Sequence, residues 1–351
     1  MEQSWRKELN ISKYRDGVYS VCVSGDRVYA VGFDESLGLG IKRYRAEAFN
    51  TRNGDRVASW ADDQGHHFAS LFTCRSSGNY IYAFGATEGF WSAIAFNKDL
   101  QVVKRADFEN PYLMPFSCLF VDKHIYIAGT SFGPEVRTSA SFVKLNSENL
   151  SKINGAEFET DILESGAYAL AYSSGNKYIV AGGFTRTRSS IEWYIQLFDE
   201  NLKLLDTIKP SVKGTITGIA VDLDGFIYAV DGYRVAKLDS KGKLIQSVDK
   251  PSGTKILASE GRDSPLSENI AVASNEGVYL LSRDKLSVVD SWKLSTTGAK
   301  ALSPLLGSMG FDQSNLYLPL VQIESDTKWN WVILALKPKS RGIFTRIFGK
   351  K

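Results

Sequence analysis

The chain has 351 residues, of which 43% are apolar and 23% charged, which is ordinary for a globular protein with a sizeable core. Its formal net charge is +3, but residues 337–351 alone contain six Lys or Arg and no acid. Subtracting that +6 leaves about −3 for the rest of the chain, which excludes a protein whose whole surface coats nucleic acid.

The ends and the cysteines of the chain favour a soluble, cytoplasmic protein. The first ten residues lack the apolar core of a signal peptide, and no run approaches the roughly 18 apolar residues that a membrane span needs. Three cysteines are too few for a disulfide framework in a chain of this length. We expect Cys22, Cys74 and Cys118 to be buried as small apolar side chains.

One pattern repeats along the chain: a turn, then alternating β-branched and aromatic residues, and usually a glycine. It occurs seven times, at residues 25–32, 78–85, 122–129, 175–182, 224–232, 268–274 and 314–320. Successive copies lie roughly 43–53 residues apart, the spacing typical of solenoids and propellers. An apolar run precedes each copy and two further strand-like runs follow, so each unit predicts four short strands.

These units predict an all-β fold, a seven-bladed β-propeller over residues 1–337. The stretch SWRKEL (4–9) resembles the fourth-strand stretch SWKL (291–294), yet it precedes the first unit. The seventh unit shows only three clear strands. We therefore expect residues 3–11 to pair with residues 329–337 and close the ring, which leaves residues 338–351 as a tail outside it.

Two segments resemble known propeller families. Residues 219–248 resemble a unit of the NHL family, with an Asp-Gly turn, a strand, Arg-Val, a second strand and Gly-Lys-Leu. Residues 173–183 resemble kelch repeats, although the Gly-Gly pair occurs once, at Gly182 and Gly183. The absence of a Trp-Asp dipeptide disfavours the Trp-Asp repeat family. The resemblance implies the architecture, and propellers of this kind have many functions.

The innermost strands give little support for catalysis. Enzymatic propellers are expected to place acids or His on these strands, whereas here they are apolar or small. His66 and His67 are adjacent, so on a strand they would point to opposite faces and could not readily bind one ion. We therefore predict no catalytic residue, no cofactor and no metal.

A protein-binding surface is better supported. The connections between second and third strands are long in units one to four and seven, and they should lie on one face. Interface hot spots are enriched in Trp, Tyr and Arg. We assign the partner-binding residues in and beside these loops as Trp91, Phe132, Arg137, Arg186, Arg188 and Trp329. The alternative is a set of solvated loops with Trp193 and Trp329 packed beneath them.

The leading prediction is thus a non-catalytic scaffold that binds a protein partner through its long loops. One rival is an enzyme or small-molecule binder that uses the central channel. Another is a nucleic-acid-associated propeller that uses its Arg-rich loops and basic tail.

The tail carries its own prediction. Phe344, Ile347 and Phe348 would share one face of a short helical turn surrounded by basic residues. Three interpretations remain open: packing on the propeller, attachment to nucleic acid or an anionic membrane, and docking on a protein. In the last, the tail weakly resembles the terminal peptides that bind sliding clamps, with Arg341 in the place of the usual Gln.

Overall fold

The computed structural model describes residues 1–109, 113–132, 138–157, 164–251, 253, 255–258, 268–294, 301–303 and 308–339. Within these ranges, the side chains at 132, 157, 255–258 and 301–303 are left undescribed. The described residues form strands, turns and bends, and none of them belongs to a helix that could cross a membrane.

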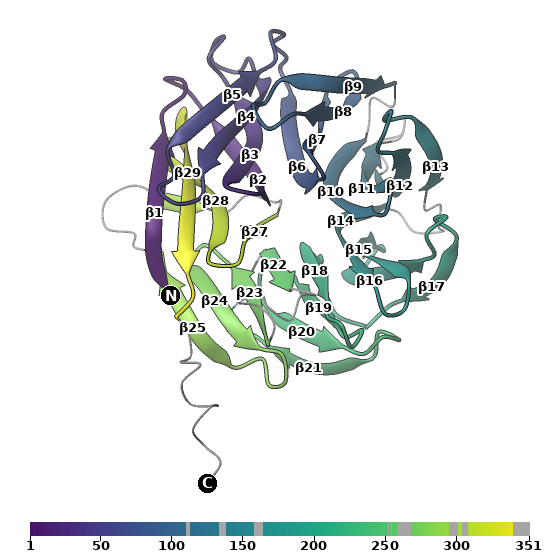
Figure 1. Ribbon diagram of the computed structural model, residues 1–351. Coiled ribbons are helices and arrows are strands. Elements are labelled where there is room, and N and C mark those ends of the chain that lie inside the picture. The colour runs from purple at the N-terminus through teal and green to yellow at the C-terminus, as the bar shows by residue number, and fades with distance from the viewer. Residues whose placement is uncertain are drawn as a thin grey trace.

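The strands form seven antiparallel sheets around a common axis, as Figure 1 shows. Blades one and two comprise β2 (Gly17–Ser24), β3 (Arg27–Asp34), β4 (Arg43–Asn50), β5 (Arg56–Ala61), β6 (Ala69–Ser77), β7 (Tyr80–Thr87), β8 (Trp91–Phe96) and β9 (Val102–Phe108). Blades three and four comprise β10 (Met114–Val121), β11 (His124–Phe132), β12 (Thr138–Asn146), β13 (Lys152–Glu157), β14 (Glu164–Ser173), β15 (Tyr178–Arg186), β16 (Ile191–Phe198) and β17 (Leu204–Ile208).

The remaining three blades continue in chain order. Blades five and six comprise β18 (Gly218–Val221), β19 (Ile227–Val230), β20 (Val235–Leu238), β21 (Leu244–Val248), β22 (Lys255–Ala258), β23 (Asn269–Ala273), β24 (Gly277–Ser282) and β25 (Val288–Lys293). Blade seven comprises β26 (Ala301–Ser303), β27 (Gly310–Phe311), β28 (Leu316–Ser325), β29 (Lys328–Lys337) and, from the other end of the chain, β1 (Glu2–Leu9).

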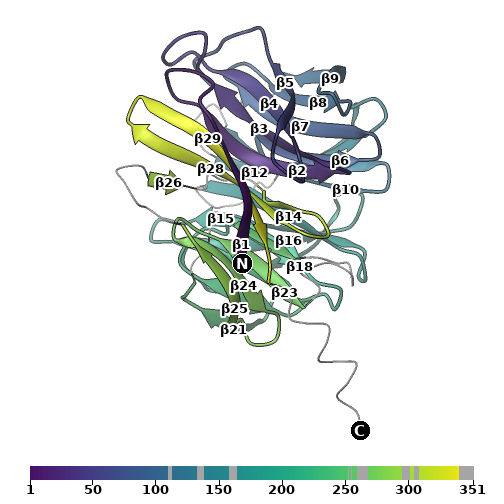
Figure 2. The same ribbon diagram turned by 60° about the vertical axis from the view of Figure 1, so that its left-hand side comes forward.

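The predicted ring closure is confirmed. β1 pairs antiparallel with β29, from Glu2 opposite Lys337 to Leu9 opposite Trp331. Figures 1 and 2 show the first strand lying along the last, at the outside of blade seven. β1 covers the outer edge of β29, and within the described residues the last strand ends at Lys337. The tail from residue 340 onward lies outside the described residues.

A recurring tyrosine links neighbouring blades. On the second strand of a blade, its hydroxyl donates to a backbone carbonyl in the turn between the third and fourth strands of the next blade. These bonds are Tyr29 to Lys98 at 3.1 Å, Tyr82 to Ser147 at 3.1 Å and Tyr126 to Glu200 at 2.6 Å. Between blades seven and one, the equivalent hydrogen bond comes from Trp5, whose indole N–H donates to the Thr51 carbonyl at 2.8 Å. The tyrosines of the sequence repeat therefore join blades.

The turns between third and fourth strands share a buried leucine in the left-handed backbone region. Its φ lies between 49° and 61°, and its side chain is at most 6% exposed, at Leu100, Leu150, Leu202 and Leu286. A non-glycine residue accepts this conformation at a cost, which burial of the leucine offsets. In blade five the same position is Gly242, with φ +77°.

The core lies between blades. Each apolar cluster combines side chains of two adjacent sheets, as where Trp5 and Trp331 of blade seven pack with Val18 and Phe49 of blade one. This arrangement leaves the inner strands facing a central channel.

Candidate docking face at the channel mouth

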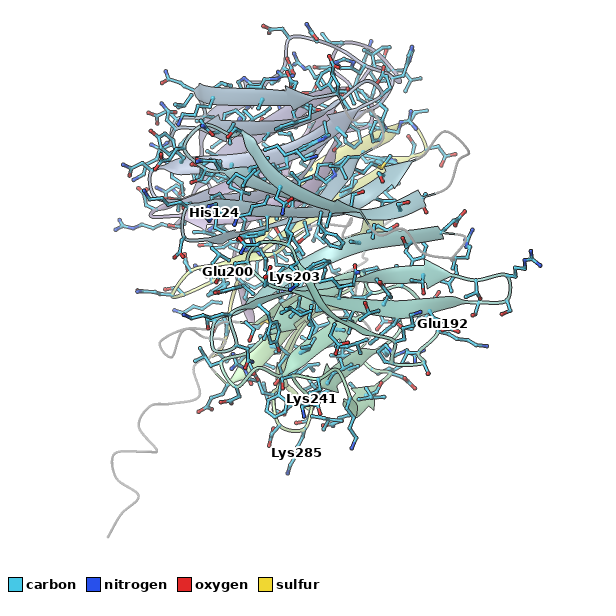
Figure 3. All side chains as sticks on the ribbon, turned by 90° about the vertical axis from the view of Figure 1, so that its right-hand side faces the viewer. His124, Glu192, Glu200, Lys203, Lys241 and Lys285 are labelled. Carbon is cyan, nitrogen blue, oxygen red and sulfur yellow. The ribbon has the colours of Figure 1, made fainter. Side chains whose placement is uncertain are left out.

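The two faces of the disc carry different connections. Loops between second and third strands, and loops between blades, lie on one face, which we call the long-loop face; the turns of the tyrosine links lie on the other. Figure 3 shows Glu192, beside the loop of blade four, on the opposite side from His124 and Glu200. The described connections lie on this one face, but the predicted difference in their length is wrong for three blades. The connection of blade one spans 35–42, whereas those of blades two, four and seven span 88–90, 187–190 and 326–327, no longer than 231–234 in blade five. The strands of these blades continue through residues that the sequence pattern assigned to loops, and the connection of blade three lies outside the described residues.

Trp91 lies next to a loop of this face, but its side chain is buried, in contrast to the sequence-based expectation. Its side chain is 2% exposed and stacks on Phe108 of the neighbouring strand, with ring centres 4.0 Å apart. Trp91 is the first residue of β8, so its side chain enters the sheet packing rather than the loop. It contributes core stability and is not available to a partner.

The two arginines of blade four are accessible. Arg186 is exposed at the end of β15 and forms an ion pair with Glu164 at 2.8 Å. Arg188 is exposed in the turn that follows, and no carboxylate of the described residues pairs with it. Both side chains are exposed beside the loop of blade four, as the sequence analysis expected, although Arg186 is paired with Glu164.

Trp329 is partly buried on the same face, at the junction of blades seven and one. The guanidinium of Arg15 lies 5.9 Å from the centre of its ring, and the backbones of the two residues form a bridge. Trp193, by contrast, is fully buried and donates its indole N–H to Asp231 at 3.0 Å. The packing alternative thus holds for Trp193 and in part for Trp329.

The remaining predicted contact residues fall outside what the structure describes. Arg137 lies in an undescribed segment, and Phe132 is described as backbone only. The three tail residues are also outside the described ranges: Phe344, Ile347 and Phe348.

The inner strands of blades one to four each contain a β-bulge that the sequence pattern did not reveal. The register shifts by one residue on the inner strand, so that this residue has no partner on the second strand. The bulged residue is aromatic in all four blades: Tyr19, Phe72, Phe116 and Tyr168. No such shift occurs in the described inner strands of blades five and six.

In the first four sequence repeats, a glycine at the end of the repeat or directly after it is required by this bulge. It faces the residue before the bulge, and the inner strand approaches it closely. A Cβ at this glycine would meet a backbone carbonyl oxygen at 1.8–2.3 Å, as found for Gly32, Gly85, Gly129 and Gly183. A side chain of any size would therefore displace the inner strand.

The bulged aromatic residues contact one another from blade to blade. Ring centres lie 5.0 Å apart for Tyr19 and Phe72, 5.4 Å for Phe72 and Phe116, and 4.8 Å for Phe116 and Tyr168. We call these four residues the aromatic arc. Each lies in the first half of its inner strand, which begins at the long-loop face, so the arc lies at that mouth of the channel.

Two further rings extend the arc at its ends. Phe33 lies 6.3 Å from Tyr19, and Phe184 lies 6.0 Å from Tyr168. Phe72 is 3% exposed, whereas Tyr19, Phe116 and Tyr168 are partly exposed. Burial raises the pKa of Tyr19 and of Tyr168, so both phenols stay neutral and add no charge to the mouth.

The other end of the channel contains a small cavity of about 140 Å³, lined by Cys22, Arg75 and Met309 among others. All three cysteines are buried free thiols, as predicted. Burial raises the pKa of Cys118 to about 12 and that of Cys22 well above its usual value. The two therefore stay protonated, which makes them poor nucleophiles and poor metal ligands.

The histidine pair belongs to the loop before β6. The carboxylate of Glu88 accepts the backbone N–H groups of His67 at 3.2 Å and Phe68 at 3.1 Å. Among the described residues, no group of three or more His, Cys, Asp or Glu could hold a metal ion. His66 and His67 thus lie in a polar loop held by Glu88, and not on a strand.

The sequence contains a signal for the arc. In each of the four inner strands the aromatic residue is followed by Ser, Thr or Ala and then by an apolar residue, as in Tyr19-Ser20-Val21 and Phe116-Ser117-Cys118. The Ser117 hydroxyl accepts the Leu170 N–H of the next blade at 3.0 Å. This triplet marks the four aromatic residues as equivalent positions, but it does not reveal the bulge that turns them toward the channel.

Solved structures share this architecture at low sequence identity. A chain from the crystal structure of the Mitotic Checkpoint Complex aligns over 96% of this chain and 92% of its own length, with TM-score 0.63 and 10% identity. The WD40 domain of Neurospora crassa Pan2 aligns over 95% and 94%, with TM-score 0.61 and 12% identity. Chaetomium thermophilum Sqt1 aligns over 97% and 99%, with TM-score 0.60 and 11% identity.

The chain is therefore a seven-bladed β-propeller, and identities this low show the fold alone. A WD40 domain has the same fold, although this sequence contains no Trp-Asp dipeptide. No protein-family model matches the sequence, and no curated protein matches it. The resemblance to NHL and kelch repeats remains a prediction.

Proposed function

We propose that this propeller is a non-catalytic scaffold of the cytoplasm that binds a protein partner at the channel mouth of its long-loop face. The observation that carries the proposal is the aromatic arc, a connected row of rings that is partly exposed on one face. Aromatic side chains with a buried edge and an accessible edge are typical interface anchors, because their positions are fixed before binding.

The surroundings of the arc support protein binding. Arg186 and Arg188 are exposed beside blade four, and Tyr233, 75% exposed, lies on the same face in blade five. Arginine and tyrosine are both enriched at interface hot spots. One chain of the same fold belongs to a protein complex, the Mitotic Checkpoint Complex.

Affinity capture from a lysate of the native cells tests the proposal. The tagged chain is compared with a double variant, Phe116→Ser plus Tyr168→Ser, and with a control, Tyr80→Ser. Tyr80 is also an exposed aromatic residue, but it lies at the turn between first and second strands, on the opposite face. We expect a specific protein to be captured by the parent and the control and lost from the double variant.

Thermal melting separates loss of binding from loss of fold, and a variant that melts far below the parent is replaced by Phe116→Leu plus Tyr168→Leu. Capture that persists in a folded arc variant would refute the proposal. Capture that is lost only in Tyr80→Ser would move the interface to the other face.

A further inference from the structure

Lys42 places a cation at one end of the aromatic row. Its backbone is fixed by paired hydrogen bonds with His66, N–H to carbonyl at 2.6 and 2.7 Å. Its ammonium nitrogen lies 4.7 Å from the centre of the Phe33 ring, and the side chain is partly buried. Phe33 is 3% exposed and contacts Tyr19, so a buried ring connects the cation to the partly exposed arc.

The acids near Lys42 are committed elsewhere. Glu35 is fully buried, forms an ion pair with Arg15 at 3.3 Å and accepts the Arg15 backbone N–H at 3.4 Å. Asp34 is also fully buried and pairs with Arg43 and Arg45, each at 3.0 Å. No carboxylate of the described residues forms an ion pair with Lys42.

A partly buried ammonium without an ion pair among the described residues is an unusual arrangement. Burial lowers the pKa of Lys42, because water is removed from the charged form; the Glu35 carboxylate, which is paired with Arg15, raises it in part, and Arg15 lowers it by repulsion. The Phe33 ring offsets a part of this cost, because the face of an aromatic ring attracts a cation. An incoming anion would offset more, because the partly dry surroundings strengthen its attraction to the ammonium.

We propose that the channel mouth binds an acidic segment of a protein partner, in which a carboxylate side chain pairs with Lys42 while a nearby aromatic or aliphatic side chain packs on the aromatic arc. This inference rests on the proposed function and adds the chemistry of the bound segment. The apolar side chain supplies most of the contact area, and the carboxylate selects this segment over neutral or basic ones.

The charges of the mouth favour a peptide over a nucleic acid. Nucleic acid binding draws on a row of unpaired cations that follows the phosphates. Here Arg15, Arg43, Arg45 and Arg186 are each joined to an acid of the chain. Among the described residues, Arg188 in blade four is also without an ion pair, but Lys42 is the cation that lies beside the rings, so it fits one carboxylate together with one apolar group.

Selection from a random peptide library displayed on phage, with the full chain immobilised, tests the inference. We expect enriched peptides to contain Asp or Glu within a few residues of Phe, Trp, Tyr, Leu or Ile. The best peptide is then synthesised and its Kd measured by fluorescence polarisation for the parent, Lys42→Met, Lys42→Arg and Lys42→Glu.

Lys241→Glu is the matched control, because Lys241 is exposed on the turn between third and fourth strands of blade five, away from the mouth (Figure 3). Lys42→Met keeps the length of the side chain over Phe33 and should weaken binding about tenfold, as expected for loss of a partly buried ion pair. Lys42→Arg should retain most of the affinity. Lys42→Glu should weaken it further and should favour a peptide whose acid is replaced by Lys.

Several results would overturn the inference: no enriched peptide, enriched peptides without an acid, or unchanged affinity in Lys42→Glu. Tighter binding of a single-stranded DNA oligonucleotide than of the peptide, weakened by Lys42→Glu, would assign the cation to nucleic acid instead. The variant Phe116→Ser plus Tyr168→Ser tells the two proposals apart. If it abolishes peptide binding while Lys42→Glu does not, the mouth binds a partner but Lys42 does not select its charge.

Discussion

The hydroxyl of Tyr126 in blade three donates a hydrogen bond of 2.6 Å to the backbone carbonyl of Glu200 in blade four. The ammonium of Lys144 donates to the same carbonyl at 2.8 Å. Burial raises the pKa of Tyr126, so the phenol keeps the proton that it donates. One carbonyl of a turn thus receives two side chains from the preceding blade, and this contact fixes the distance between the two sheets.

The first prediction concerns this shared carbonyl. Tyr126→Phe and Lys144→Met should each lower the free energy of unfolding by about 1 kcal/mol, because one donor remains after either change. The double variant should lose about 1 kcal/mol more than the sum, because the Glu200 carbonyl is then left without a side-chain donor. Urea unfolding of the four proteins measures the coupling. Strict additivity would show that the two bonds act independently.

The second prediction concerns the bulge glycines. Gly129→Ala would bring a Cβ to 2.1 Å from the Met114 carbonyl oxygen, so the inner strand must move. We expect a loss of about 3 kcal/mol or more in the free energy of unfolding, at the upper end of overpacking costs. Gly89→Ala is the control, since a Cβ there meets nothing within 4 Å. Equal melting temperatures for the two variants would contradict the account of the bulge.

The third prediction concerns ring closure. Deletion of residues 1–11 removes β1 and exposes the outer edge of β29, which should cause aggregation or a large loss of thermal stability. Trp5→Ala should cost about 3–5 kcal/mol, because Trp5 is 7% exposed and bonds to Thr51. Val57→Ala, at a side chain 46% exposed on β5, should change little. A truncated chain that melts with the parent would exclude this mode of closure.

The fourth prediction concerns the left-handed leucines. Leu202→Ala and Leu202→Gly both remove buried contacts of the side chain. For Leu202→Ala we expect the free energy of unfolding to fall by about 2–5 kcal/mol. Gly additionally relieves the left-handed strain at φ 61°, about 1–2 kcal/mol. We therefore expect Leu202→Gly to be more stable than Leu202→Ala in chemical unfolding. At Leu197, inside strand β16, the usual order should hold, with Ala more stable than Gly. The same order at both sites would refute the strain argument.

The sequence by itself determined the number of blades, the order of their strands and the closure by the N-terminal strand. Turn residues, alternation of side chains and the spacing of copies are local signals, and seven repetitions of them reinforce one another. The pairing of the two chain ends followed from a count of strands. The seventh unit had only three strands, and one extra strand-like segment preceded the first unit.

Only the tertiary structure decided which aromatic side chains are available to a partner. Alternation along a strand assigns each residue to one face, but a single bulged residue reverses the assignment for all residues on one side of it. Phe116 and Tyr168 therefore reach the channel mouth, although the sequence favoured Trp91, which stacks on Phe108 in the core. The approach of Lys42 to Phe33 likewise depends on the path of a loop between strands, and no periodic pattern encodes that path.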